Sequence, residues 1–486
     1  MSSRKRKSRW STAFHLCCTI FCVSHSESLD INLPILGDTS SSIVSVQQEY
    51  LIGRSWLKAF RARVPEYKDP LVKEYLEHLL FNLATYSQLK DTQLELIIVD
   101  NPTMNAFAVP GGVIGINIGI FNYAKSEDQL ASVLAHELAH LSQRHFARGI
   151  EERRKNASFG MGGLLVGLVF AAAGNADAGT AVISASQAAS LESSLRYSRS
   201  NEREADRIGL ETIRNSGRDP AAVGEMFEQM LSASRHIGNR PPEFLLTHPV
   251  TEKRISDAKN RLLRFPKKYY PESEAYNLIR IRTMTQNIDS PSEKVKHFKH
   301  QLQNTYFNLD PIKYGLTLSL MQNGDYEEAR KILNELVTED PNQFIFKYTS
   351  IELDISNQHL FEAKNKIEKL LTMRPTSYPL KFLNSKVLRR ENRYDEAIKI
   401  LKDLSRERPN DPDLWYQLAE VSGLAGDISG VHLARAEYFI LVGDFERAKL
   451  QLSQAAKLLR GDFKHFAIIQ QRLQDLLLIQ ERVANL

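Results

Sequence analysis

The C-terminal part of the chain repeats itself every 34 residues, and this period restricts its fold more than any other feature. Prolines recur at this spacing, and so do alanines and the large side chains three positions before each alanine: Pro341, Pro375 and Pro409; Ala329, Ala363 and Ala397; Tyr326, Leu360 and Tyr394. A supersecondary unit of this size cannot bury its apolar face alone, so neighbouring units must stack. We therefore predict a curved helical array that offers a concave face to a protein partner.

The end of the array departs from this period, which is that of tetratricopeptide repeats. Similar turn-to-helix sequences occur at residues 324–329 and 443–448, but the step from Ala397 to Ala448 is 51 residues. We expect about four repeats within residues 305–486, with an insertion or an extra helix near residues 426–434.

A second feature, the sequence His-Glu-Leu-Ala-His at residues 136–140, indicates metal chemistry. Two histidines four residues apart on a helix lie on the same face, so both imidazoles can bind one ion. The carboxylate of Glu137 lies about a quarter turn away, where it can act as a general base on a water at the metal without being a ligand. This arrangement is typical of zinc peptidases.

The surrounding residues predict the helix that this site needs. Ser126 followed by Gln129 is a capping-box pattern at a helix start. Apolar residues then recur at helical spacing: Leu130, Val133, Leu134 and Leu138. We therefore expect His136 and His140 to lie on an amphipathic helix.

A catalytic zinc needs a third protein ligand, and residues 197–206 are its expected source. Glu202 and Asp206 are four residues apart in a second predicted helix, so their side chains share one face. Glu204, a competing ligand candidate, points to a different face, and we expect it to have a surface role.

These two motifs resemble the pattern of the CAAX-prenyl-protease-like and HtpX-like zinc metallopeptidases, which is H-E-x-x-H followed by E-x-x-x-D. The resemblance implies one Zn²⁺ per chain, with three metal ligands at His136, His140 and Glu202 and a catalytic base at Glu137. It also implies that Asp206 is a buried acid that hydrogen-bonds a liganding histidine and fixes its tautomer.

The resemblance extends from about Leu33 to the C-terminus through residues 33–37, 105–112 and 247–255. One branch of the family shares these segments and combines a signal peptide, a zinc peptidase domain and a tetratricopeptide tail. It implies an α+β zincin-type metallopeptidase domain with a small sheet, followed by an all-α repeat array. It also implies unfolded or misassembled outer-membrane proteins as clients and the outer-membrane beta-barrel assembly complex as a partner of the repeats.

The N-terminus has the pattern of a secretory signal, which we place at residues 1–26. Five basic residues precede an apolar run at residues 14–23, which is too short to span a bilayer comfortably. All three cysteines, Cys17, Cys18 and Cys22, lie in this segment, so the mature chain would contain none. We expect a protein of the Gram-negative periplasm with no membrane span after cleavage.

Charge argues against nucleic acid as a partner. The chain has 63 basic and 58 acidic residues, and the predicted signal removes five of the basic ones. The mature protein is therefore nearly neutral, which gives no electrostatic reason to expect nucleic acid or anionic lipid.

Composition and pattern divide the rest of the chain into three parts: a peptidase domain at residues 27–265, a helical connector at 266–304, and the repeat domain at 305–486. Helices are expected around residues 45–89, and strand-like runs at 94–99 and 113–120. The edge of the resulting small sheet can pair with an extended substrate backbone.

Two further segments leave alternatives open. Residues 158–190 are rich in Gly, Ala and apolar residues, and we interpret them as a docking or gating element and not as a membrane span. His248 follows an apolar run in a turn-prone sequence. It is either a buried histidine bonded to a carbonyl, a group that stabilises the tetrahedral oxyanion, or a fourth zinc ligand that holds the enzyme latent.

The sequence therefore predicts a periplasmic zinc metalloendopeptidase with a chaperone-like role, which degrades misassembled or unfolded proteins and assists outer-membrane beta-barrel assembly. The alternative is a repeat-based chaperone or scaffold whose protease site is latent. A membrane prenyl-protease activity is disfavoured, because the chain lacks multiple apolar spans of about 20 residues.

Overall fold

The computed structural model describes the following residues: 44–156, 199–236, 243–263, 265–266, 268–285, 290–306 and 308–484. The predicted signal at 1–26, the segment 33–37 and the Gly/Ala-rich segment 158–190 lie outside these ranges. Among the helices that are described, none combines the length and apolar character that crossing a membrane requires.

Two helices precede the sheet, as the sequence predicts. α1 (Val46–Arg61) begins with a capping box in which Ser45 and Gln48 exchange side-chain and backbone hydrogen bonds. α2 (Pro70–Tyr86) begins at Asp69, whose side chain accepts hydrogen bonds from the first turn.

In the part of the chain that the structure describes, the sheet has three strands in the order β1-β3-β2: β1 (Glu95–Val99), β2 (Ala106–Val109) and β3 (Val113–Asn117). β1 and β3 are the two predicted strands and run parallel, while β2 pairs antiparallel with β3. Gly111 and Gly112 form the turn between β2 and β3 with φ values of 75° and 79°, a conformation that favours glycine. β2 is thus an edge strand, because its second edge pairs with no other described strand.

The helix α3 (Glu127–Ser142) follows a 3-10 turn, η2 (Ile118–Asn122), and carries the H-E-x-x-H sequence. Ser126 caps it through a hydrogen bond from the Gln129 amide, but the Gln129 side chain accepts from the Lys125 amide, so the predicted capping box is only half formed. The predicted amphipathic helix has no exposed face between Gln129 and His140, because every residue in this range is buried. Its polar face is covered by other parts of the peptidase domain.

Five more helices are described in the peptidase part of the chain: α4 (His145–Asn156), α8 (Arg199–Asn215), α9 (Ala221–His236), α10 (Glu243–Thr247) and α11 (Glu252–Leu262). α8 and α9 both pack on α3, and α8 has the more extensive contact. Gly209 permits this close approach, because a Cβ atom at that position would lie 3.2 Å from the His136 backbone nitrogen. The acidic residues of α8 are thereby brought beside the α3 histidines.

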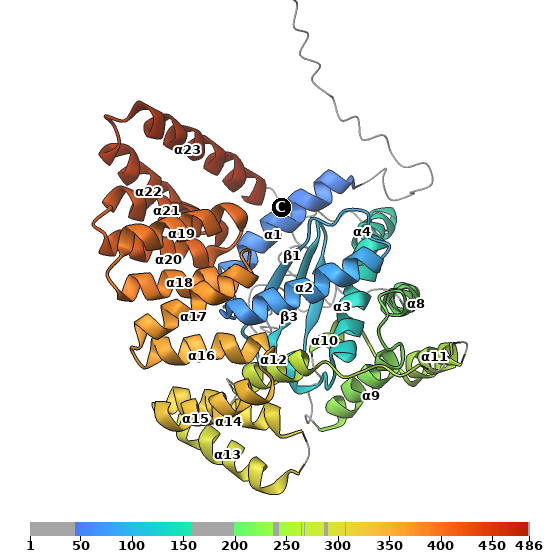
Figure 1. Cartoon of the computed structure of the whole chain (residues 1–486). Helices are drawn as coiled ribbons and strands as arrows, with labels where there is room; N and C mark the ends of the chain where they lie inside the picture. The colour runs from blue at the N-terminus through green and yellow to red at the C-terminus, as the bar shows by residue number, and fades with distance from the viewer. Residues whose placement is uncertain are drawn as a thin grey trace, which may run out of the picture.

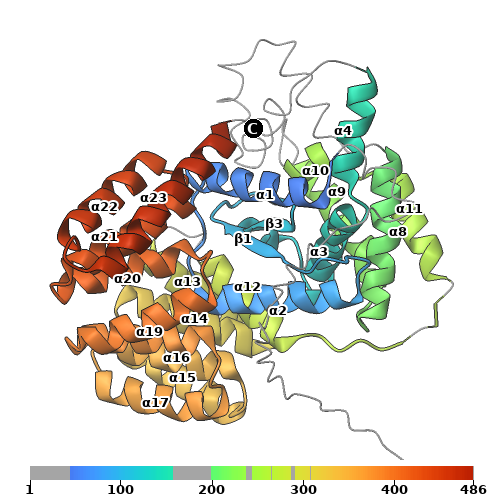
Figure 2. The same cartoon turned by 90° about the horizontal axis from the view of Figure 1, so that it is seen from above.

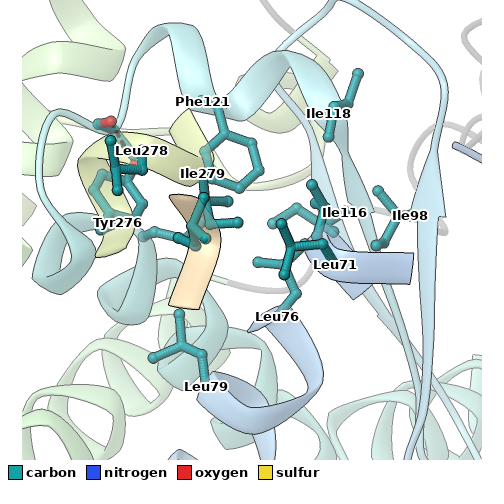
Figure 3. Close-up of a cluster of buried hydrophobic side chains, with 14 of the residues drawn as sticks. Leu71, Leu76, Leu79, Ile98, Ile116, Ile118, Phe121, Tyr276, Leu278 and Ile279 are labelled. Carbon is teal, nitrogen blue, oxygen red and sulfur yellow. Dashed lines mark hydrogen bonds between the residues drawn. The ribbon is translucent and has the colours of Figure 1, made fainter. Parts of the chain in front are cut away.

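The predicted connector contains α12 (Glu274–Met284) and α13 (Pro291–Asn304). α12 is more than a link. Tyr276, Leu278 and Ile279 are fully buried, and Figure 3 shows them among side chains of α2, β1 and β3. The largest apolar cluster continues from the sheet through α12 into the repeats, so no break in the core marks the predicted domain boundaries.

The repeat region consists of helices in antiparallel pairs: α14 (Leu309–Asn323), α15 (Tyr326–Glu339), α16 (Phe344–Ser356), α17 (Leu360–Met373), α18 (Tyr378–Arg390), α19 (Tyr394–Glu407), α20 (Pro412–Leu424), α21 (Ile428–Leu441), α22 (Phe445–Leu458) and α23 (Phe463–Ala484). α21 begins 34 residues after Tyr394, so the period continues through it. The 51-residue step arises because the sequence at 443–448 begins the first helix of the next pair.

The repeat array curves along one side of the peptidase domain, so that its last helix lies beside α1 (Figures 1 and 2). α18 contacts α2. Buried charges join the two parts, and the Lys73 ammonium of α2 lies 2.8 Å from the Asp411 carboxylate at the start of α20.

Candidate metal centre

Three elements bring four candidate ligands together. α3 carries His136 and His140 on one face, α8 carries Glu202, and His248 follows α10. One ligand atom from each of these residues lies within 4.8 Å of the other three, and all four side chains are buried.

The separations between these atoms match those of a tetrahedral ion site. The Nε2 atoms of His136 and His140 are 3.0 Å apart, and the Glu202 carboxylate oxygens lie 3.5 Å from the first and 3.4 Å from the second. Ligands bound tetrahedrally to zinc at about 2.0–2.1 Å are separated by about 3.3 Å. The residues present therefore fit a small tetrahedral cation.

His248 lies at the fourth corner of this set. Its Nδ1 atom is 2.9 Å from Glu202 Oε1 and 3.4 Å from His136 Nε2. Its backbone amide donates to the Phe244 carbonyl, which ties the residue to the end of α10. The sequence alone leaves the place of His248 open, and the structure puts its ring nitrogen among the candidate ligand atoms.

Glu137 faces the same space with its hydrogen-bonding capacity unused. It is fully buried, and neither carboxylate oxygen has a hydrogen-bond partner among the described residues. Burial raises the pKa of Glu137, although the His248 and His136 rings act in the opposite direction. Nε2 of His248 lies 3.6 Å from Oε1 of Glu137. A buried acid without a hydrogen bond is costly, so this carboxylate is arranged for a group outside the protein chain.

Burial and the neighbouring charges shift the pKa values of the histidines and of Glu202 in different directions. Burial lowers the pKa of His140 well below its ordinary value, which keeps a neutral imidazole available as a ligand. Burial would also lower the pKa of His136, but the carboxylates of Asp206 and Glu202 raise it to about 9. Burial opposes ionisation of Glu202 too, yet the three surrounding histidines hold its pKa well below the ordinary range.

Asp206 of α8 and Arg254 of α11 lie next to the ligand cluster. An Asp206 oxygen lies 3.1 Å from Nδ1 of His136, the ring nitrogen that faces away from the other ligands. Arg254 donates two hydrogen bonds to Asp206, at 2.7 and 2.6 Å, and its Nη1 atom lies 2.9 Å from a Glu202 oxygen. Nη1 also donates to the Pro249 carbonyl directly after His248. Arg254 was noted in sequence only as part of a shared segment, without a role.

His145 and Glu204 form a second group behind His140. Nδ1 of the buried His145 ring is 2.8 Å from Nδ1 of His140, and its Nε2 is 3.2 Å from a Glu204 oxygen. The Glu204 side chain is about one third exposed, and Arg148 also donates to it. Glu204 therefore reaches the surface, as expected, but it contacts the site as well. Sequence spacing alone does not single out His145.

The chain matches family models in both of its parts. The model described as Peptidase family M48 matches residues 70–262, and tetratricopeptide-repeat models match residues 313–342 and 355–421. The matched peptidase segment contains all three sequence-predicted ligands and ends after Arg254.

Relatives of the whole chain are also found. A putative beta-barrel assembly-enhancing protease of Vibrio cholerae is 30% identical over 479 residues, which cover 98% of each chain. The beta-barrel assembly-enhancing protease of Escherichia coli K12 is 29% identical over 93% of this chain and 92% of its own. The mitochondrial metalloendopeptidase OMA1 of Schizosaccharomyces pombe is 32% identical over 203 residues, 40% of this chain and 57% of its own.

Proposed function

The chain belongs to the M48 metallopeptidases, in the family of the beta-barrel assembly-enhancing proteases, and on this premise we propose that it is a periplasmic zinc metalloendopeptidase that cleaves unfolded or misassembled proteins. The observation that carries the proposal is the convergence of four buried ligand atoms beside a buried carboxylate with no hydrogen-bond partner among the described residues. A structural ion cluster would not need the carboxylate of Glu137 beside it.

The proposed ligands are His136, His140 and Glu202, a set of two histidines and one carboxylate that is known in catalytic zinc sites. When bound, zinc polarises the scissile carbonyl and makes a water molecule more acidic. Glu137 accepts the proton of the attacking water and passes it to the leaving amine. Asp206 holds the His136 ring in place, because a carboxylate beside the second ring nitrogen fixes the tautomer.

The edge strand β2 offers a place for the substrate backbone. It packs against α3, so a peptide paired with its free edge would run beside the ligand cluster. Strand addition recognises the main chain, which makes an extended conformation the main requirement for cleavage. This supports unfolded proteins as substrates.

We further propose that His248 keeps the resting site latent as a fourth ligand. The position of its Nδ1 atom supports this role over that of an oxyanion donor, because it lies among the ligand atoms. Latency predicts that His248→Ala raises basal proteolysis several-fold. Lost proteolysis with zinc retained would instead support the oxyanion role.

The clients and partners are proposed from the relatives. The names of the Vibrio and Escherichia proteins refer to beta-barrel assembly, which supports outer-membrane proteins as clients and the outer-membrane beta-barrel assembly complex as a partner of the repeats. The rival function is a chaperone or scaffold in which the repeats do the main work. The position of His248 partly favours this scaffold function, because a site whose fourth metal position is filled by His248 would not cleave until His248 moved away.

Degradation of an unfolded test protein by wild type and by Glu137→Gln, with bound metal quantified in both, tests the proposal. We expect metal in both and cleavage only by the wild type, reduced by about 10²–10⁴-fold in the variant. Metal without cleavage in both proteins would favour the latent or scaffold function. Absence of bound metal from the wild type would contradict the metal site.

A further inference from the structure

Each of the two α3 histidines has a second ring nitrogen that faces away from the ligand cluster, and α8 lies behind both. Asp206 of α8 approaches the second nitrogen of His136 at 3.1 Å. On the other side, His145 approaches the second nitrogen of His140 at 2.8 Å, and Glu204 of α8 lies 3.2 Å from the far nitrogen of His145. The two sides therefore differ by one inserted imidazole.

The positions of the protons follow from the ligand role proposed for His140. A ring nitrogen that binds a metal carries no proton, so the proton of neutral His140 resides on Nδ1. Nδ1 then donates to Nδ1 of His145, which must be the unprotonated nitrogen of that ring. Nε2 of His145 consequently carries the proton and donates to Glu204, which accepts because a carboxylate has no proton to give. Each N–H group in this series of hydrogen bonds, from His140 through His145 to Glu204, therefore meets an acceptor.

We propose that His145 and Glu204 are positioning residues that orient His140 for metal binding through this hydrogen-bond relay. The proposal rests on the proposed function, since it requires His140 to bind metal through Nε2. Three residues of α8 would then contribute to the site: Glu202 binds the metal, Asp206 orients His136, and Glu204 orients His140 through His145.

Burial makes the relay specific. The His145 side chain has no exposed surface, and its ring meets the His140 ring edge-on at 75° with centroids 4.8 Å apart. A wrong tautomer of His145, with its proton on Nδ1, would place two protons between the rings, and the ring has no exposed surface through which water could satisfy them. The charged acceptor Glu204 opposes that tautomer, because hydrogen bonds to ions are about twice as strong as neutral ones.

Metal affinity of the full-length protein, stripped of metal and titrated with Co²⁺ against a chromophoric chelator, tests the relay without measuring cleavage. His145→Leu removes the acceptor, whereas His145→Asn retains an oxygen that can accept from His140. Glu204→Gln keeps side-chain volume but removes the charge. Glu211→Gln on the same helix, in an exposed pair with Arg207, is the matched control.

We expect His145→Leu to weaken Co²⁺ binding about 10–100-fold and to alter the Co²⁺ absorption spectrum, as loss of a partner behind a metal ligand commonly does. His145→Asn should bind within about 3-fold of the wild type, and Glu204→Gln should lie between the two. Glu211→Gln should match the wild type.

Equal impairment of His145→Leu and His145→Asn would overturn the relay, since His145 would then act by packing alone. Unchanged affinity in His145→Leu would also overturn it. If His145→Leu does not fold, Glu204→Gln decides, and wild-type affinity in that variant contradicts the relay. A wild type that binds no Co²⁺ would instead overturn the proposed metal site.

Discussion

Two buried polar regions of this protein are built in opposite ways. At the contact between the peptidase domain and the repeats, charges that are buried or half-buried meet opposite charges, as Lys73 meets Asp411 and as Arg282 of α12 meets both Asp69 and Glu352. At the candidate metal centre, four ligand atoms converge on one point, and Glu137 has no hydrogen-bond partner among the described residues. The first region is paired by the protein's own charges, while the second is arranged to take a cation between its ligand atoms.

This difference separates stability from function. Removing a charge from the repeat contact should destabilise the fold and leave metal binding intact. Removing a group from the metal centre should chiefly weaken metal binding and cost less stability, because Arg254 contacts two acids there and keeps one of them.

The largest effect is expected from Lys73→Met. The variant leaves buried Asp411 without its main cation, which should lower the free energy of unfolding by about 3–5 kcal/mol. Denaturant titration measures this, and zinc affinity should not change. Lys381→Met is a matched control, because its exposed pair with Glu407 contributes about 0–1 kcal/mol. If the free energy of unfolding of Lys73→Met lies within about 1 kcal/mol of the wild-type value, the Lys73–Asp411 pair does not stabilise the contact between the two domains.

Glu202→Gln should reverse that pattern. Structural zinc sites bind with about 10–16 kcal/mol shared among four ligands, so loss of one should weaken zinc binding by about 2.5–4 kcal/mol, on the order of 100- to 1000-fold. The metal-free variant also loses the Glu202–Arg254 ion pair, but Arg254 keeps Asp206 as a partner. Its loss of stability should therefore be smaller than that of Lys73→Met. Chelator competition measures the zinc affinity and denaturant titration the stability. Zinc affinity equal to that of the Glu211→Gln control would remove Glu202 from the ligand set.

Asp206→Asn is expected to have a smaller effect on zinc, about 10–100-fold in affinity, because Asp206 supports His136 and does not bind the ion. The same competition assay applies. The variant also loses the charge that Arg254 pairs with, so Arg254→Lys is a useful companion. Equal losses in Glu202→Gln and Asp206→Asn would contradict the distinction between a ligand and its support.

The repeat contact should also have a pH signature. Burial opposes ionisation of Asp411, but Lys73 holds the pKa of Asp411 below its ordinary value of 3.8. A carboxyl with a depressed folded-state pKa stabilises the fold above its unfolded-state pKa, and this stabilisation is lost as pH falls through the folded-state pKa. The stability difference between wild type and Lys73→Met should therefore be largest near neutral pH and shrink below pH 4. A difference that is constant down to pH 2 would argue against an Asp411 contribution.

The sequence could predict those parts of the molecule that depend on local spacing. His136 and His140 share a face because they are four residues apart on one helix, and Glu202 and Asp206 do so for the same reason. The repeat helices follow from a period that recurs along the chain. β2 was missed as a strand because it is four residues long and has no alternating pattern.

Other features depend on packing between distant segments and had no local signal. Glu204 meets His145 across 59 positions, and Arg254 meets Asp206 across 48. Lys73 and Asp411 are 338 positions apart. The surroundings of α3 could not be foreseen either, because its polar face is buried by residues of α8 and by His248.

Zinc K-edge X-ray absorption of the wild-type protein, loaded with one equivalent of zinc, identifies the atoms that bind the ion. We expect nitrogen and oxygen ligands at about 2.0–2.1 Å with scattering from three imidazoles, and loss of one imidazole in His248→Ala. Zinc that dialyses away, or a spectrum without imidazole scattering, would contradict a metal centre at His136, His140 and Glu202.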